Sequence, residues 1–91
     1  MLAPKYTPHF RDDVRRVAKR GYDMLKLTDV ILLLLTNNRP LPAQYRDHPL
    51  KGQWKNHREL HIESDWLLIY YLKDEDCVFV TTGTHAELFG K

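Results

Sequence analysis

Four titratable side chains in the C-terminal half of the chain have the types needed for acid–base chemistry. His48, His61, Asp65 and His85 fall at expected strand edges and turns. Imidazole groups donate and accept protons near neutral pH, and basic side chains nearby can hold a phosphate. Such cations are present at Lys51, Lys55 and Arg58. The set predicts metal-independent cleavage of RNA, which needs an activated 2′-hydroxyl, a protonated leaving oxygen and stabilised phosphorane charge.

Aromatic residues lie among these polar groups and offer surfaces on which RNA bases could stack. They are Trp54, Trp66, Tyr70 and Phe89. Tryptophan is also a common core residue, and Trp66 is expected to be at least half buried.

Each titratable residue also has a purely structural interpretation. His48 could cap a turn, Asp65 could be a turn residue, and His85 could be an exposed residue at the start of a helix. His61 alternates with Leu60 and Ile62, so its side chain should point away from that strand's buried face. The catalytic prediction therefore depends on the whole set converging at one place.

Other site chemistries lack support in the sequence. His57 and His61 are four residues apart on an expected strand, a span of roughly 13 Å, so this pair cannot share a metal ion. Ser64 is the only serine and Cys77 the only cysteine, and neither has a nucleophile motif around it. No glycine-rich phosphate loop is present, and no cofactor is expected.

Two helices are expected in the N-terminal half. Thr7 and Pro8 form a helix start, and Gly21 ends that helix. A second helix should begin near Asp23, with apolar residues at helical spacing up to Leu35, and Asn37-Asn38 should end it. Residues 39–53 contain three prolines and a glycine, a composition that favours a loop.

Three strands are expected after this loop. The first contains Leu60 and Ile62, the second runs from Trp66 to Leu72 and should be central, and the third runs from Cys77 to Thr82. Residues 84–89 favour a short helix or turn, and residues 2–6 could add an edge strand. The predicted class is α+β, with two N-terminal helices packed on one face of a curled, mainly antiparallel sheet.

The length and charge of the chain limit the number of domains and the kind of partner that can be expected. Ninety-one residues predict a single domain, spanning 1–91. The net charge is +2, but residues 1–61 hold twelve Lys and Arg against six Asp and Glu, while residues 62–91 hold two against six. The basic part could attract an anionic partner or could be solvated helix surface. No signal peptide or membrane segment is evident, so a cytoplasmic location is expected.

The residues from Leu41 to Phe89 closely resemble the YafQ branch of the RelE/ParE toxin superfamily. The elements that carry the resemblance are Leu41-Pro42-Ala43, Tyr45, Asp47-His48-Pro49-Leu50, Gly52, Trp54-Lys55, Arg58, His61, Asp65-Trp66, Leu68-Ile69-Tyr70 and Thr82-Gly83-Thr84-His85-Ala86-Glu87-Leu88-Phe89.

This resemblance implies a type II toxin with a microbial RNase fold, which cuts messenger RNA in the ribosomal A site through attack by the 2′-hydroxyl. It implies that His85 is the principal proton donor, that His48, His61 and Asp65 are the other acid–base and orienting groups, and that Phe89 positions a base. Lys51, Lys55, Arg58 and Trp66 are predicted to bind RNA. The implied partners are a cognate antitoxin, the ribosome and messenger RNA, with operator DNA bound only through the antitoxin.

One position departs from the family pattern. Thr81 stands where the family usually has an arginine that stabilises phosphorane charge, and loss of such a cation commonly costs about a hundredfold in rate. Three interpretations stay open: Lys51, Lys55 or Arg58 substitutes for it, the protein is weakened or repurposed, or Thr81 is an introduced change.

Two competing functions follow from the same sequence. A non-catalytic module of this fold would bind its antitoxin without cutting RNA, and Thr81 favours that alternative. The gyrase-directed relatives of the superfamily lack this histidine set, so the histidines argue against that function.

Overall fold

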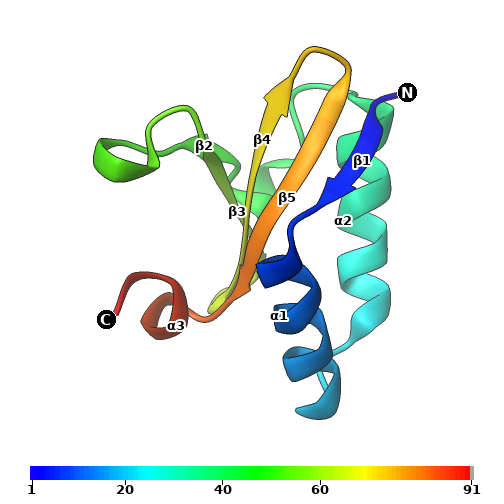
Figure 1. The fold of residues 1–91 in the computed structure, drawn as a ribbon. Helices are drawn as coiled ribbons and strands as arrows, with labels where there is room; N and C mark the ends of the chain where they lie inside the picture. The colour runs from blue at the N-terminus through cyan, green and yellow to red at the C-terminus, as the bar shows by residue number, and fades with distance from the viewer. Residues whose placement is uncertain (91) are drawn as a thin grey trace.

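The computed structural model describes residues 1–90, which form a five-stranded mixed sheet and three helices (Figure 1). The elements in chain order are β1 (Ala3–Tyr6), α1 (Pro8–Lys19), α2 (Met24–Thr36), β2 (His48–Pro49), β3 (Arg58–Glu63), β4 (Trp66–Lys73), β5 (Asp76–Gly83) and α3 (His85–Phe89), with 3-10 turns η1 (Ala43–Tyr45) and η2 (Gly52–Trp54). The predicted α+β class is confirmed, including the edge strand near the N-terminus.

The helix boundaries follow the capping residues of the sequence. The Thr7 hydroxyl accepts a hydrogen bond from the backbone N–H of Phe10 (3.0 Å), and the Asp23 carboxylate caps α2 in the same way. Asn37 ends α2 in the left-handed conformation, with φ 58°. No helix within residues 1–90 combines the length and apolar character needed to cross a bilayer.

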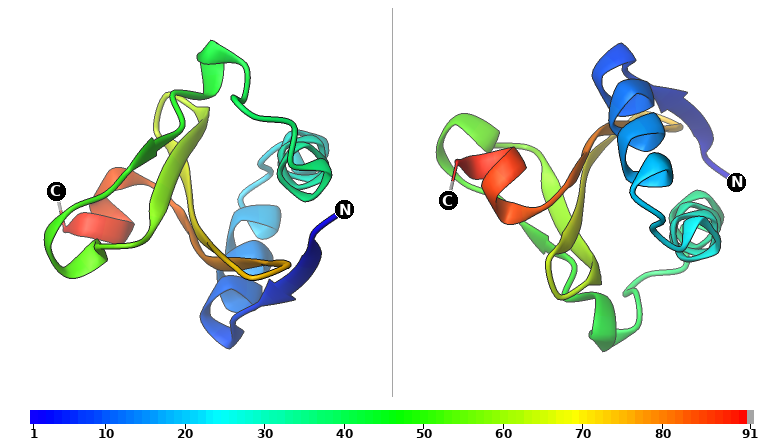
Figure 2. Two further views of the ribbon diagram at one scale, coloured as in Figure 1. Left: turned by 90° about the horizontal axis from the view of Figure 1, so that it is seen from above. Right: turned by 90° about the horizontal axis from the view of Figure 1, so that it is seen from below.

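The strand order is β1-β5-β4-β3-β2, so β4 is central as predicted. β1 pairs parallel with β5, and the other pairs are antiparallel. Both faces of β4 from Trp66 to Tyr70 are buried. The N-terminal helices lie on one side of the sheet, whereas α3 and the turn η2 lie on the other (Figure 2).

β3 separates the core from the side of the sheet that faces α3. Leu60 and Ile62 belong to the core shared with α2, and alternation places Glu59 and His61 on the opposite face. The predicted loop at residues 39–53 contains the two-residue strand β2, which pairs His48 with Glu59. So short a strand, one of whose residues is proline, has no hydrophobic alternation by which it could be recognised.

Candidate active site

α3 holds His85 beside the turn between β3 and β4. Thr84 caps this helix in a capping box with Glu87. The carboxylate of Asp65 accepts a hydrogen bond from the backbone N–H of His85 (2.9 Å), and its Oδ1 lies 2.6 Å from His85 Nδ1. These two hydrogen bonds, backbone first, lower the pKa of Asp65. The carboxylate can only accept, so Nδ1 carries the proton and Nε2 is the nitrogen available for proton transfer.

The three predicted histidines converge from three different elements. The ring centroid of His61 on β3 lies 6.2 Å from that of His48 on β2 and 5.7 Å from that of His85 on α3. The outer two side chains, His48 and His85, are 46% and 43% exposed, whereas His61 is 12% exposed. We call these residues, with Asp65, the histidine cluster. Its outer members can meet an RNA phosphate from solvent.

Glu59 lies next to the histidine cluster, although it was not predicted as a site residue from the sequence. Its carboxylate lies between two imidazoles, with Oε2 3.2 Å from His48 Nε2 and Oε1 3.9 Å from His61 Nε2. These three ligand atoms all lie within 4.8 Å of one another, so the group could hold a metal ion. The i,i+2 spacing of Glu59 and His61 on a strand was the available signal, while the position of His48 depended on β2.

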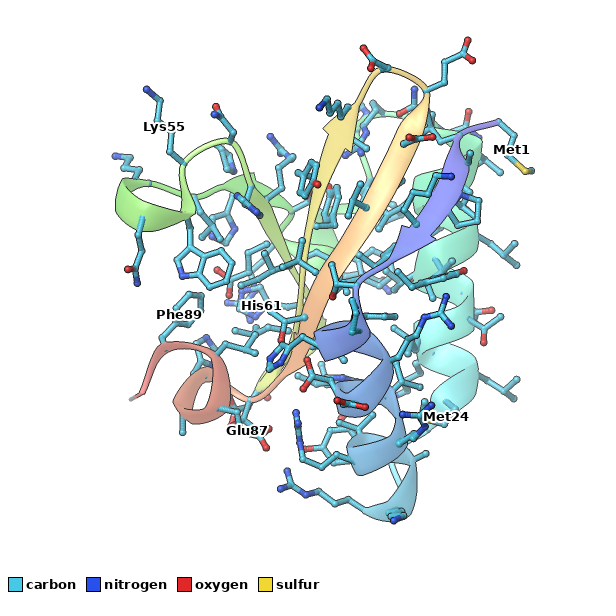
Figure 3. The ribbon with its side chains drawn as sticks, in the orientation of Figure 1. Met1, Met24, Lys55, His61, Glu87 and Phe89 are labelled. Carbon is cyan, nitrogen blue, oxygen red and sulfur yellow. The ribbon has the colours of Figure 1, made fainter. Side chains whose placement is uncertain are left out.

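Phe89 forms an aromatic wall with Trp54 beside the cluster. Their ring centroids are 6.2 Å apart at an interplanar angle of 84°, and both side chains are half-buried. Figure 3 shows His61 and Phe89 on the same side of the sheet. This contact joins η2 to α3, and the exposed parts of the two rings could stack against an RNA base.

Trp66 does not belong to this wall, and its predicted role in RNA binding is wrong. It is 1% exposed, its Nε1 donates to Thr82 Oγ1 (3.0 Å), and its ring packs edge-on against Tyr22. Tyr70 is also fully buried, and its hydroxyl donates to Asp47 (2.6 Å). Desolvation, followed by this hydrogen bond, raises the pKa of Tyr70 to about 12. Neither ring can stack on RNA.

The three predicted phosphate-binding cations lie in different environments. Arg58 is on the core-facing side of β3, away from His61, and binds Asp47 through Nε (3.3 Å) and Nη2 (3.2 Å). The structure therefore does not bring Arg58 to the histidine cluster. Lys51 and Lys55 are exposed at the two ends of η2, and Figure 3 shows Lys55 there. Their charge is accessible to a ligand.

Thr81 is buried and its hydroxyl is already bonded. Thr81 Oγ1 donates to Asp13 Oδ2 (2.5 Å), and the backbone N–H of Thr82 donates to the same oxygen (3.2 Å). Asp13 is 1% exposed and also binds Arg16 Nη1 (2.7 Å). Thr81 lines a pocket of about 300 Å³ with Trp54 and other residues of α1, β5 and α3. Glu87 also lines this pocket, so a longer side chain at position 81 that extended into it would meet that carboxylate.

Arg16 on α1 is a further cation close to Thr81. Its guanidinium bridges Asp13 and Glu87, with Nε 3.0 Å from Glu87 Oε2, and it also donates to the carbonyl of Thr82 (3.1 Å). Arg20 binds Glu87 as well (2.8 Å). The pKa of Glu87 is lowered first by the Thr84 backbone hydrogen bond and then by these arginines. The network fixes α3, and with it His85, to α1.

Comparison with known proteins places the chain among bacterial toxins. The family described as "Bacterial toxin of type II toxin-antitoxin system, YafQ" matches residues 2–90. The mRNA interferase toxin YafQ of Escherichia coli K12 is 50% identical over 86 residues, 94% of each chain. The chain is similar to YafQ in the E. coli DinJ–YafQ complex, with 48% identity, a TM-score of 0.93, and 99% and 100% of the two chains covered. It is also similar to a metal-bound toxin from Helicobacter pylori, with 38% identity, a TM-score of 0.90, and 98% and 100% covered.

Proposed function

This chain belongs to the YafQ family of bacterial toxins of type II toxin–antitoxin systems, and from that premise we propose that it is an endoribonuclease that cleaves messenger RNA in the ribosomal A site. The observation that carries the proposal is the convergence of His48, His61 and His85 beside Asp65 on one side of the sheet. The name of the E. coli relative, an mRNA interferase, agrees with cleavage of messenger RNA. The ribosome, which is cytoplasmic, would position the substrate.

The proposed proton transfers follow from which nitrogen of each imidazole is already held by a hydrogen bond and which faces the substrate. His85 holds its Nδ1 proton toward Asp65, so its protonated Nε2 would donate to the leaving 5′-oxygen, and Asp65 would stabilise the imidazolium before transfer. His61, the nearest imidazole, would accept the proton of the 2′-hydroxyl, with His48 beside it. The hydroxyl oxygen then attacks phosphorus, the bond to the 5′-oxygen breaks, and a 2′,3′-cyclic phosphate forms. No metal ion takes part in these steps.

Substrate positioning is assigned to the aromatic wall and the η2 lysines. Phe89 would support a base next to the scissile phosphate, because its ring is half-exposed and fixed against Trp54. Lys51 or Lys55 would supply part of the charge that an arginine at position 81 provides in relatives. Arg58 is not assigned this role because Asp47 holds its guanidinium on the other face.

The proposed partners follow from family membership and from the DinJ–YafQ complex. We assign to this chain a cognate antitoxin whose binding covers the histidine cluster. Contact with operator DNA would then occur only through the antitoxin. An acidic antitoxin segment would match the excess of Lys and Arg in residues 1–61.

Primer extension on messenger RNA in programmed ribosomes tests the activity. The purified chain should give cuts in the A site, and His85→Ala should reduce their rate by about 10²–10⁴-fold, the usual contribution of a general acid. His9→Ala is the matched control, since it removes an exposed histidine outside the cluster. Equal cutting by wild type and His85→Ala would refute the assignment.

A second candidate, a non-catalytic toxin-fold module, is favoured by the buried Thr81 hydroxyl. It predicts no cuts by the wild-type chain and antitoxin binding that survives. Thr81→Arg then tests the missing cation, because a gain of about a hundredfold would identify an impaired enzyme. If Thr81→Arg changes nothing while Lys55→Ala abolishes cutting, Lys55 is the substitute cation.

The metal-bound state of the H. pylori relative makes one control necessary. Cleavage should persist when transition metals are removed with a chelator that leaves the Mg²⁺ of the ribosome in place. Loss of cleavage under those conditions would contradict a mechanism based on free imidazoles.

A further inference from the structure

A row of four aromatic rings runs from the aromatic wall beside the histidine cluster to the central strand β4. Phe89 packs edge-on against Trp54, with ring centroids 6.2 Å apart, and Trp54 packs edge-on against His57 at 5.4 Å. His57 in turn packs edge-on against Tyr71 of β4 at 5.1 Å. All four side chains are half-buried, so neighbouring rings hold each ring in place while part of it stays exposed.

The row ends at a basic pocket of about 350 Å³. Lys55 and Lys73 line it together with His57 and Tyr71, and no carboxylate within residues 1–90 belongs to the lining. Both lysines are exposed, and neither forms a salt bridge in the described part of the chain, where the lysine that does so is on α2. Unpaired ammonium groups next to aromatic rings are typical of sites for single-stranded nucleic acid, in which cations hold phosphates and rings hold bases.

The tautomer of His57 indicates which part of a nucleotide it could contact. Its Nδ1 lies 3.1 Å from the carbonyl of Lys55, and a carbonyl can only accept, so Nδ1 carries a proton. Neutral His57 therefore offers Nε2 as an acceptor, which suits a ribose 2′-hydroxyl and not a phosphate. The two lysines are the groups that would hold a phosphate.

We propose that the messenger RNA strand runs from the histidine cluster along these rings, and that a second phosphate, distinct from the cleaved one, binds between Lys55 and Lys73. The inference rests on the proposed function, because it takes RNA as the substrate. Neighbouring nucleotides of a stacked strand are roughly 3.4 Å apart. Neighbouring rings of the row are 5.1–6.2 Å apart, so the row has room for more than one nucleotide. Figure 3 shows Phe89 and Lys55 on the same side of the molecule and apart from each other.

Lys73 and Tyr71 test this site alone, because Lys55 is also a candidate for binding the scissile phosphate. Lys73→Gln removes one exposed charge, and Lys5→Gln on β1 is the matched control, since it removes the same charge from an exposed lysine outside the row. Tyr71→Leu removes a ring of the row, whereas Tyr71→Phe keeps it. Circular dichroism and melting temperatures establish that the variants are folded. If Tyr71→Leu does not fold, Lys73→Gln decides the result.

The first measurement is cleavage in programmed ribosomes of messenger RNA in which one phosphate at a time is replaced by an uncharged methylphosphonate. The A-site codon fixes the position of each replacement relative to the cleaved bond. One replacement away from that bond should raise the half-saturating concentration of the wild-type chain several-fold, and it should have little further effect in Lys73→Gln. Such coupling identifies a lysine and a phosphate that are in contact.

The second measurement is binding of a single-stranded oligoribonucleotide at several salt concentrations, with His85→Ala present in every chain to prevent cleavage. A lysine that contacts a phosphate contributes to the release of counterions, so the slope of log K against log salt should fall by about 0.7 in Lys73→Gln. Lys5→Gln should keep the original slope. Tyr71→Leu should weaken binding by about tenfold, because a stacked base loses its ring, and Tyr71→Phe should lose less.

Equal salt dependence in Lys73→Gln and Lys5→Gln would refute the site. If Lys73→Gln slows the reaction but no phosphate of the messenger is coupled to it, the lysine contacts ribosomal RNA and the assignment to the messenger is wrong. If only the binding of poly-glutamate is weakened, the surface serves an acidic protein partner, which also overturns the proposal. A wild-type chain that cuts no messenger would refute the proposed function, whereas the salt dependence would still test the site.

Discussion

Asp65 receives two hydrogen bonds from one residue, since its Oδ1 accepts from both the backbone N–H and the Nδ1 of His85, twenty positions further along the chain. The backbone bond fixes the start of α3, and the side-chain bond fixes the imidazole. One carboxylate thus sets both the position of the helix and the tautomer of its first residue.

Asp65→Asn should lower the cleavage rate by about tenfold to a hundredfold, because the amide keeps the size of the side chain but no longer stabilises the His85 imidazolium. The alkaline limb of the pH–rate profile should shift to lower pH, because the amide no longer favours the protonated form of the general acid. Asp29→Asn, an exposed change on α2, is the control. An unchanged profile would show that Asp65 does not act through His85.

Asp65→Asn should lower the free energy of unfolding near neutral pH and have a smaller effect at acidic pH. The pKa of Asp65 is lowered in the folded chain, so its contribution is complete above the ordinary carboxyl value of about 3.9 and is lost as the pH falls through the folded pKa. Urea unfolding at pH 7 and pH 3 should therefore show a difference between wild type and Asp65→Asn that shrinks at the lower pH.

Gly83→Ala should loosen α3 without altering a residue of the cluster. A Cβ at this position would lie 2.8 Å from Glu87 Oε1 and 3.0 Å from Arg16 Nη2, so both side chains would have to move. Loss of the capping box should reduce the free energy of unfolding by about 1 kcal/mol. The cleavage rate should fall even under conditions in which the variant is fully folded, because His85 would no longer be held in place. Arg20→Gln, which removes an exposed partner of Glu87, should have a smaller effect.

Asp13→Ala should be strongly destabilising, by about 2–4 kcal/mol in urea unfolding. It would leave the Arg16 guanidinium and the Thr81 hydroxyl without their buried partner. Asp12→Ala is a closely matched control, because Asp12 is 74% exposed and pairs with Arg15 at the surface. That change should stay within roughly 0.5 kcal/mol of wild type. Similar effects of the two substitutions would contradict the role given to the Asp13 network.

Lys55→Ala tests whether Lys55 supplies positive charge to the RNA, and Arg58→Ala tests whether Arg58 instead stabilises the fold. Lys55 is exposed beside the aromatic wall, so its loss should slow cleavage by about tenfold with an unchanged melting temperature. Arg58 is bonded to the largely buried Asp47, so its loss should reduce stability by about 1–3 kcal/mol. Measuring both quantities on both variants tests the assignment, and the opposite pattern would reverse it.

Most elements of the fold were predictable because their signals are local. Thr7 and Asp23 cap helices through neighbouring backbone N–H groups, and the alternation around Leu60 and Ile62 marks a half-buried strand. β2 was not predictable, since its two residues pair only because β3 lies beside them. The expected burial of Trp66 is confirmed, but its predicted contact with RNA was wrong, and the ion pair of Arg58 with Asp47 was not predicted. An arginine can bind a phosphate or a buried carboxylate with the same sequence around it.

The residue types for proton transfer, the elements that carry His61, Asp65 and His85, and the family are all readable from local pattern and motif. Tertiary packing was needed to show that His48, His61 and His85 meet, that Glu59 lies between two of them, and that Asp13 and Arg16 surround Thr81. These relations join residues of separate elements. They depend on strand register and helix packing, and the register follows from the burial of one strand face, which no short segment specifies alone.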